Sequence, residues 1–498
     1  MPPEPIDQAT NAELWAMLGT AEGLERADLL LELGDRAAGE GDYGRARAMF
    51  EEAADVALKA DHRPLVGSAQ YRLGRVLFGA GEYEASAEAY GQAANFYDAP
   101  DDGTERAVAL WGRADALRVL GDFAGALAAA TESRAFAETE ESFQLAGDAC
   151  FQQARALYFL DRDHEALLAC RDARDHLRGL GLTSDVAMID DFALTICMYL
   201  GDLDQAMDLA TSCHILAKTS STPDDDAYAM RRLAEVHMQR GDAEEALQLL
   251  DQARSRYREA DRTIGVARCD QMRGELLTTT GQLDEALEVF TEARVLFDAT
   301  GDDRSALRCD MDRAILLHLL GQYEAAARAN RAIIDSCSDD HDVSVRSWRR
   351  WAIVRLADNL LAAKASADAL DVTDTWPRET ADEDGVEPAY LALTALRARA
   401  YRELGRDEEA LTAAEEVLQA TTMANLPRDA GHMFEIRAAA HAEEGGPAWE
   451  HDLTRAIAAH LAAGDVTRAT ELSAHFMPGE DTGEQLKLDL PRQDPGRH

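Results

Sequence analysis

The sequence predicts an all-α fold, an α-solenoid of about eleven antiparallel helix hairpins. Three observations lead to this prediction. A short phrase recurs every forty residues, apolar residues on both sides of it have helical spacing, and small residues recur at fixed distances from it. A fixed period of this length is typical of repeat proteins, because one hairpin cannot bury its apolar face alone whereas a stack of hairpins can.

The recurring phrase begins with glycine in seven of its eight regular copies. Examples are GQLDEA at 281 and GQYEAA at 321, and Asp161 alone replaces the glycine. The copies begin at residues 41, 81, 121, 161, 201, 241, 281 and 321; later ones drift to KASADA at 364, GRDEEA at 405 and a weaker echo at Gly445. Glycine adopts the left-handed conformation at low cost, so the phrase predicts an elbow between two helices. Asp242 and Glu245 have capping-box spacing, which predicts the start of the second helix.

Residues at fixed distances on either side of the elbow recur down the chain. Seven residues before the elbow position stand Gly34, Gly74, Ala114, Ala154, Ala234, Gly274 and Ala314, with Leu194 as the exception. Nine residues after it stand Phe50, Tyr90, Ala130, Cys170, Ala210, Leu250 and Phe290. We therefore expect the two helices of each hairpin to pack closely as antiparallel neighbours.

This pattern resembles the tetratricopeptide repeat over roughly residues 24–476. In that family, small residues lie where the helices touch and the second helix carries an aromatic. The usual unit has thirty-four residues, and a forty-residue unit is similar to the longer-helix variants of kinesin light chains and of sensor parts of some bacterial regulators. The resemblance implies a bacterial-type protein built from repeats alone, a right-handed superhelix, and first helices that line a concave groove for partner peptides.

The organisation predicted from the pattern has four parts. Residues 1–23 form a lead and a capping helix, NAELWAML, and residues 24–335 form regular repeats. Residues 336–476 continue the solenoid with irregular repeats and an acidic loop at 376–390. Residues 477–498 form a flexible tail, because the pattern stops and proline and glycine become frequent.

Charge and cysteine usage exclude several classes of function. The net charge is −43, from 50 basic and 93 acidic residues, which argues against direct nucleic-acid binding because phosphate contacts need lysine and arginine. Seven cysteines without a C-x-x-C pair indicate a reducing compartment. With no basic, apolar leader and no long apolar run, we expect a cytoplasmic protein without a membrane segment.

Arginines on the predicted first helices are the main candidate site. Two neighbouring units read RCDQMRGELL from 268 and RCDMDRAILL from 308. The predicted groove residues are Arg231, Arg232, Arg268, Arg273, Arg308, Arg313, Arg350 and Arg355. Arginines in a groove suit an acidic peptide, because a guanidinium binds a carboxylate through two hydrogen bonds. The alternative is that they form ordinary helix-face ion pairs, since Asp270 and Asp310 stand three residues before Arg273 and Arg313.

The tail contains a second candidate, QLKLDL at 485–490. It resembles the short motif by which bacterial polymerases and repair factors hold the sliding clamp. Gln485, Leu488 and Leu490 stand at the motif positions, with Leu486 between them. The alternative is an apolar tail segment that packs on the last helix.

No catalytic or metal-binding pattern is found in the sequence. It has no phosphate loop, nucleophile elbow or H-E-x-x-H motif. Five histidines crowd the C-terminal part without the i, i+4 spacing of metal ligands: His432, His441, His451, His460 and His475. We therefore expect no catalytic residues, no metal and no cofactor.

The function predicted from the sequence is a non-catalytic scaffold that holds protein or peptide partners in a groove. One alternative is a regulatory sensor whose superhelix tightens when a peptide or small ligand binds. Another is an accessory factor of replication or repair, tethered to the sliding clamp through the tail. The fold alone does not decide between them.

Overall fold

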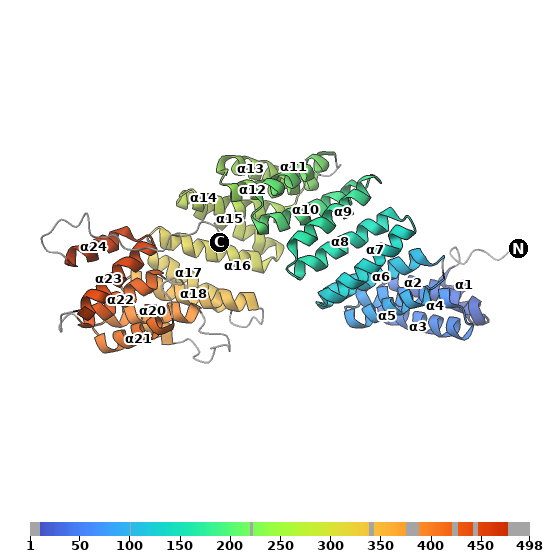
Figure 1. Cartoon of the computed structure of the whole chain (residues 1–498), viewed down its shortest axis with the longest axis horizontal. Helices are drawn as coiled ribbons and strands as arrows, with labels where there is room; N and C mark the ends of the chain where they lie inside the picture. Colours follow the sequence, from blue (N-terminus) through green and yellow to red (C-terminus); the bar gives the residue numbers. More distant parts are fainter. Residues whose placement is uncertain are drawn as a thin grey trace. The chain divides into compact units, whose positions relative to one another are not determined.

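A computed structural model describes residues 10–99, 101–219, 223–337, 343–374, 388–420, 427–441 and 447–476. These residues form 24 α-helices and no strand (Figure 1). The first twelve are α1 (Asn11–Leu18), α2 (Gly23–Gly39), α3 (Tyr43–Lys59), α4 (Arg63–Gly79), α5 (Tyr83–Phe96), α6 (Gly103–Leu120), α7 (Phe123–Thr139), α8 (Phe143–Phe159), α9 (Asp163–Arg178), α10 (Thr183–Leu200), α11 (Leu203–Thr219) and α12 (Pro223–Arg240). The others are α13 (Ala243–Glu259), α14 (Thr263–Thr279), α15 (Leu283–Thr300), α16 (Asp303–Leu319), α17 (Tyr323–Ser336), α18 (Val343–Ala362), α19 (Ser366–Asp374), α20 (Pro388–Glu403), α21 (Asp407–Ala420), α22 (Pro427–His441), α23 (Pro447–Ala462) and α24 (Val466–Phe476).

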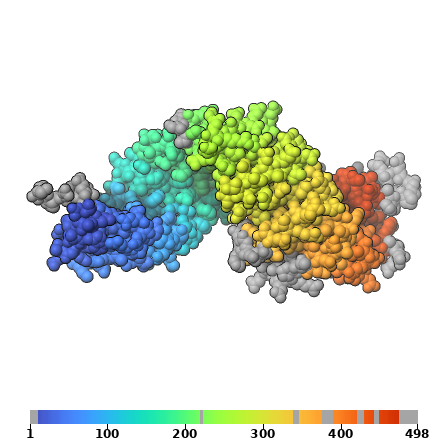
Figure 2. All heavy atoms as spheres, turned by 180° about the vertical axis from the view of Figure 1, so that it is seen from behind, coloured from blue at the N-terminus to red at the C-terminus, as the bar shows by residue number. Residues whose placement is uncertain are grey.

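The chain divides into two compact units, Met1–Ala260 and Asp261–His498. Within each unit, consecutive helices pack against each other as antiparallel neighbours (Figure 1). Side chains fill the space between them, and the blue N-terminal repeats form one continuous body (Figure 2). The predicted all-helical repeat solenoid is confirmed. The predicted change of regularity at 335/336 falls inside the second unit and stays a prediction, and most of the acidic loop lies outside the described residues.

The elbows lie where the phrase predicts them. The seven elbow glycines from Gly41 to Gly321 have φ between +72° and +89°, and Asp161 and Lys364 hold the same conformation at +56° and +63°. At a typical elbow, the N–H of Gln282 donates to the carbonyl of Leu277 at 2.9 Å. Each first helix therefore ends in a left-handed residue, and the second begins two residues later.

Two details at the elbows differ from the sequence-based prediction. The capping box at Asp242 does not form: its side chain caps no backbone N–H, and its Oδ2 lies 3.1 Å from Nδ1 of His237. The imidazole competes for the carboxylate that would otherwise cap the helix. Gly445 lies outside the described residues, and a further elbow is found at Gly464, with φ +78° and the phrase GDVTRA.

Small residues face large ones inside the hairpins. A β-carbon on Gly34 would lie 2.5 Å from the ring of Phe50, and one on Gly74 would lie 2.8 Å from the ring of Tyr90. In the fifth hairpin the large residue, Leu194, is on the first helix and the small one, Ala210, is on the second. Both are fully buried in one cluster. Close packing thus depends on the sum of the two volumes and not on glycine at one position.

None of the described helices is long and apolar enough to cross a membrane.

Candidate functional site

Arg232, on α12, is buried in the wall of a pocket between α10 and α12. It is 8% exposed, and its Nε donates to Oδ1 of Asp191 on α10 at 2.6 Å. Its other nitrogens bind the hydroxyl of Thr195 at 2.7 Å and the carboxylate of Glu235. Arg232 therefore joins two neighbouring first helices, α10 and α12.

The same kind of link occurs elsewhere between first helices. Asp35 on α2 pairs with Arg72 on α4 at 2.8 Å, and Asp358 on α18 pairs with Arg399 on α20 at 3.2 Å. These pairs span nearly one repeat each, so they fix the register of one hairpin against the next.

Two predicted arginines bind the aspartate on their own helix. Arg273 lies 3.3 Å from Oδ1 of Asp270, and Arg313 lies 2.8 Å from Oδ1 of Asp310. Asp310 also accepts a hydrogen bond from Arg294 of α15 at 2.9 Å. For these residues the helix-face ion pair that the i, i+3 spacing indicated is present.

Arg268 and Arg308 differ from the other arginines of the same two helices. They occupy equivalent positions of α14 and α16, forty residues apart, and both are exposed. Neither guanidinium makes a hydrogen bond or ion pair within the part of the chain that the structure describes. These two are the arginines of the predicted set that remain open to a partner.

The other three predicted arginines are half-buried. Arg231 lies over the ring of Tyr228, 5.0 Å from its centroid. Arg350 is half-buried on α18. Burial lowers the pKa of Arg355, and the nearby carboxylate of Asp312 partly offsets this effect. Burial in turn raises the pKa of Asp312 to about 6.

A pocket of about 470 Å³ opens between α10 and α12. The α11 residues Cys213, Leu216 and Ala217 line it, together with Met188 of α10 and Tyr228 of α12. The phenol of Tyr228 donates to Asp191 at 2.8 Å. The pocket thus combines apolar residues of α11 with polar groups of α10 and α12, among them Asp191 and Arg232.

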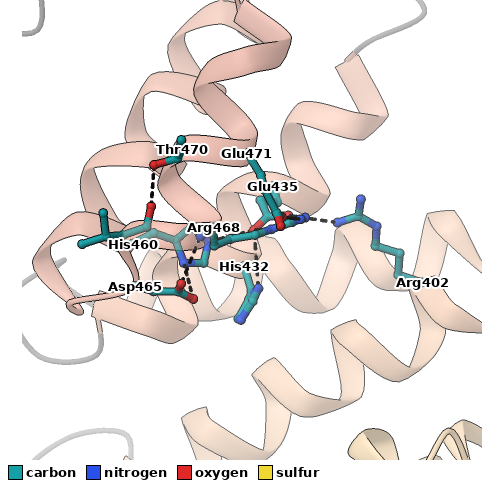
Figure 3. Close-up of polar contacts among 9 residues, drawn as sticks. Arg402, His432, Glu435, His460, Asp465, Arg468, Thr470 and Glu471 are labelled. Carbon is teal, nitrogen blue, oxygen red and sulfur yellow. Dashed lines mark hydrogen bonds and ion pairs between the residues drawn. The ribbon is translucent and has the colours of Figure 1, made fainter.

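A second cluster of polar residues joins α22, α23 and α24 (Figure 3). Glu435 of α22 is 5% exposed, and its Oε1 lies 2.7 Å from Nε2 of His460 on α23, which is fully buried. Arg468 of α24 donates from Nε to Oε1 at 3.2 Å and from Nη2 to Oε2. His432 lies one turn before Glu435, with its Nδ1 3.5 Å from Oε1.

Charge compensation in this cluster is strong. Burial by itself would raise the pKa of Glu435, but hydrogen bonds from His432, His460 and Arg468 lower it far below its usual range. The hydrogen bond to Glu435 correspondingly raises the pKa of Arg468. Glu435 is therefore a buried carboxylate anion, held by cationic and N–H groups from three helices.

Sequence reasoning missed this cluster because it compared histidines along one helix. Two signals were present: HMFE places His432 and Glu435 on one helix face, and GDVTRA repeats the elbow phrase at 464–469. An elbow at 464 predicts that the helix carrying Arg468 packs against the helix before it. Gln485, Leu486, Leu488 and Leu490 lie outside the described residues, and the tail motif stays a prediction.

Comparison with known families decides the class of the repeat. Two family models, each described as tetratricopeptide repeat, match residues 31–103 and 225–297. The chain contains tetratricopeptide repeats in these two segments. The second tetratricopeptide match includes Arg231, Arg232, Arg268 and Arg273, and the cluster of α22–α24 lies beyond both matches.

Solved structures with tetratricopeptide-like folds are similar to this chain at low identity. The apo form of RapI is 10% identical, with a TM-score of 0.48, covering 76% of this chain and 98% of that one. The apo quorum sensor NprR from B. thuringiensis is 14% identical, with a TM-score of 0.44, covering 80% and 99%. Kinesin light chain repeats from Podospora anserina are 20% identical, with a TM-score of 0.33, covering 40% and 97%. Among curated proteins, no similar sequence is found.

Proposed function

We propose that this tetratricopeptide-repeat protein is a scaffold that binds an acidic segment of a partner protein through Arg268 and Arg308. The observation that carries the proposal is the contrast within two equivalent helices. Arg273 and Arg313 hydrogen-bond to Asp270 and Asp310, whereas Arg268 and Arg308 are exposed and hydrogen-bond to no carboxylate of the described residues. The charge of Arg308 acts on Asp312 one turn away without a hydrogen bond. In each of these two helices, one arginine therefore forms an ion pair within the protein and another remains exposed to solvent.

The chemistry of these two side chains favours a carboxylate-rich segment. A guanidinium presents its N–H groups in a planar fork that matches a carboxylate. Two forks at equivalent positions of successive repeats suit two carboxylates of one extended segment. Because both arginines are exposed, the interaction is screened by salt and should weaken as ionic strength rises.

Charge reversal of the two arginines tests this proposal. The probe is a fluorescent peptide rich in Asp and Glu, with a Lys-rich peptide of equal length as its counterpart. The variant Arg268→Glu/Arg308→Glu should bind the acidic peptide about tenfold more weakly than the wild type, since exposed ion pairs contribute up to about 1 kcal/mol each. Binding is measured by fluorescence anisotropy at low and at physiological salt.

The matched control is Arg328→Glu/Arg331→Glu. Both residues are exposed on α17, a second helix of the same unit, so the net charge changes equally. An equal loss in the control would show that only net charge matters, and the proposal would be wrong. Unchanged affinity in the Arg268/Arg308 variant would also contradict it.

The sensor and the clamp tether stay predictions from the sequence. A sensor should change its radius of gyration in solution scattering when a ligand is added. A clamp tether should lose its partner when the chain ends at Met477 or when Gln485 and Leu488 are replaced by alanine. Binding through the arginines should survive both changes.

A further inference from the structure

We propose that His432, Glu435 and His460 form a binding site for one transition-metal ion. Their ligand atoms, one from each side chain, all lie within 4.8 Å of one another. A single ion can contact three atoms at such separations when each bond is about 2.0–2.2 Å long. Two imidazoles and one carboxylate are a ligand set that binds zinc in proteins.

The three side chains converge from two helices (Figure 3). His432 and Glu435 lie one turn apart on α22, and His460 reaches them from α23. The rings of His432 and His460 are nearly perpendicular, with centroids 4.9 Å apart. A β-carbon on residue 431 would lie 2.9 Å from Nε2 of His460, so Gly431 leaves room for that imidazole.

The second nitrogen of His460 supports the assignment independently. Its Nδ1 is buried and makes no hydrogen bond within the described residues, and the nearest carboxylate oxygen, Oδ2 of Asp465, lies 3.9 Å away. Because Nε2 faces Oε1 of Glu435, Nδ1 is the ring nitrogen left for a second partner, and it lies on the side of Asp465. A metal-bound histidine commonly donates its other N–H to a carboxylate in this way.

Arg468 positions the carboxylate and does not bind the metal. It holds Oε2 of Glu435 with Nη2 and reaches Oε1 only at 3.2 Å, so Oε1 is the oxygen that faces both imidazoles. Ligating carboxylates commonly carry such additional hydrogen bonds. Asp465 accepts a hydrogen bond from the backbone N–H of Arg468 at 3.0 Å, and Glu471 accepts one from its Nη1 at 2.7 Å, so two carboxylates hold Arg468 in place.

The ligand types select the class of ion. Two imidazole nitrogens favour Zn²⁺, Co²⁺ or Ni²⁺ over Mg²⁺ or Ca²⁺, which prefer oxygen ligands. His432 has 24% of its side chain exposed, so an ion can enter from its side of the cluster. We expect a site with three protein ligands and one position for water.

Metal titration of the full chain, prepared without a polyhistidine tag and stripped with a chelator, tests this proposal. Zn²⁺ is titrated against a chromophoric chelator, and Co²⁺ is followed by its visible absorption. The wild type should bind one equivalent, and His432→Ala should bind it at least about tenfold more weakly. His451→Ala is the control, because His451 is exposed on α23 outside the cluster, and it should bind like the wild type.

A stability measurement separates metal binding from misfolding. Zn²⁺ should raise the Tm of the wild type and of His451→Ala, but not the Tm of His432→Ala or His432→Gln. Without Zn²⁺, the two His432 variants should have the same Tm as each other. Equal Zn²⁺ affinity in wild type and His432→Ala would overturn the proposal. A wild type without a stoichiometric site would overturn it too, and the cluster would then be an ion-pair network only.

Discussion

The ring of Phe290 occupies the space that a β-carbon on Gly274 would need. Such a β-carbon would lie 2.8 Å from the ring atoms Cε2 and Cζ, closer than real β-carbons approach their neighbours. Phe290 is almost fully buried in the core of the second unit. The two helices of this hairpin, α14 and α15, therefore approach closely only because residue 274 has no side chain.

Replacing Gly274 by alanine should destabilise the protein by about 1–3 kcal/mol, because the added methyl group overpacks the hairpin. Shortening the partner as well, in Gly274→Ala/Phe290→Leu, recreates the Ala234 and Leu250 pair of the sixth hairpin and should recover part of the loss. Urea unfolding followed by circular dichroism measures both variants.

The control for this prediction is Gly39→Ala. Gly39 is also helical, but nothing lies within 4 Å of the position of its β-carbon. Alanine should be neutral or stabilising by up to about 1 kcal/mol there, because it favours the helix. A similar loss at both sites would contradict the packing explanation.

Breaking the link between Arg232 and Asp191 should destabilise the first unit. Arg232→Met keeps much of the volume but leaves the carboxylate of Asp191 without its guanidinium, at a cost of about 1–3 kcal/mol. Adding Asp191→Asn should recover part of it, as a double-mutant cycle would show. Arg268→Ala, at an exposed position, should change stability by less than about 0.5 kcal/mol.

The carboxyl group of Asp148 should make stability depend on pH. Burial, with a smaller contribution from Asp185, raises its pKa from 3.8 to about 6. Between these values the folded protein keeps a proton that the unfolded chain has lost, so stability falls as the pH rises through this window.

Asp148→Asn removes this dependence and should be more stable than the wild type at pH 7, by about 1–3 kcal/mol. Below pH 4 the two proteins should be equally stable. Thermal melts from pH 3.5 to 7.5 measure the difference, with the exposed Asp55→Asn as the control. A constant difference at every pH would exclude titration of Asp148 as its cause.

The cysteines should react slowly with thiol reagents in the native protein. All seven are buried, and burial raises the pKa of the thiols of Cys150, Cys170, Cys213 and Cys309 to about 12. The thiolate is the reactive form, so its population near pH 8 is very small. Titration with a disulfide reagent should find seven reactive thiols in denaturant and almost none, within minutes, without it.

Local rules explain why the helices and elbows could be predicted. The left-handed residue, the polar residue after it and the alanine that ends the phrase, as in GQLDEA, lie within six residues of each other. A short stretch of sequence is therefore enough to predict the elbow. The capping box at Asp242 failed because His237, on the preceding helix, binds the same carboxylate. Even near the elbow, a contact from a neighbouring helix can override a local preference.

Which arginines are exposed could not be predicted from the sequence. Arg268 and Arg273 lie on the same predicted helix, and the spacing to Asp270 indicates only that a helix-face pair can form. Exposure separates them, because it depends on the neighbouring helices and not on the residues beside them. The same holds for Arg232, whose partner Asp191 is 41 residues away.

The period of forty residues determined the fold, since each unit repeats the same helix signals and the same elbow. Tertiary structure alone decided which arginines are open and which histidines meet. His432 and His460 are 28 residues apart on different helices, and they come together only because α22 and α23 pack side by side, with Arg468 completing the cluster from α24. The periodic pattern contains only the residues that all repeats have in common, whereas a binding site depends on residues that occur in one repeat and on the helices packed against it.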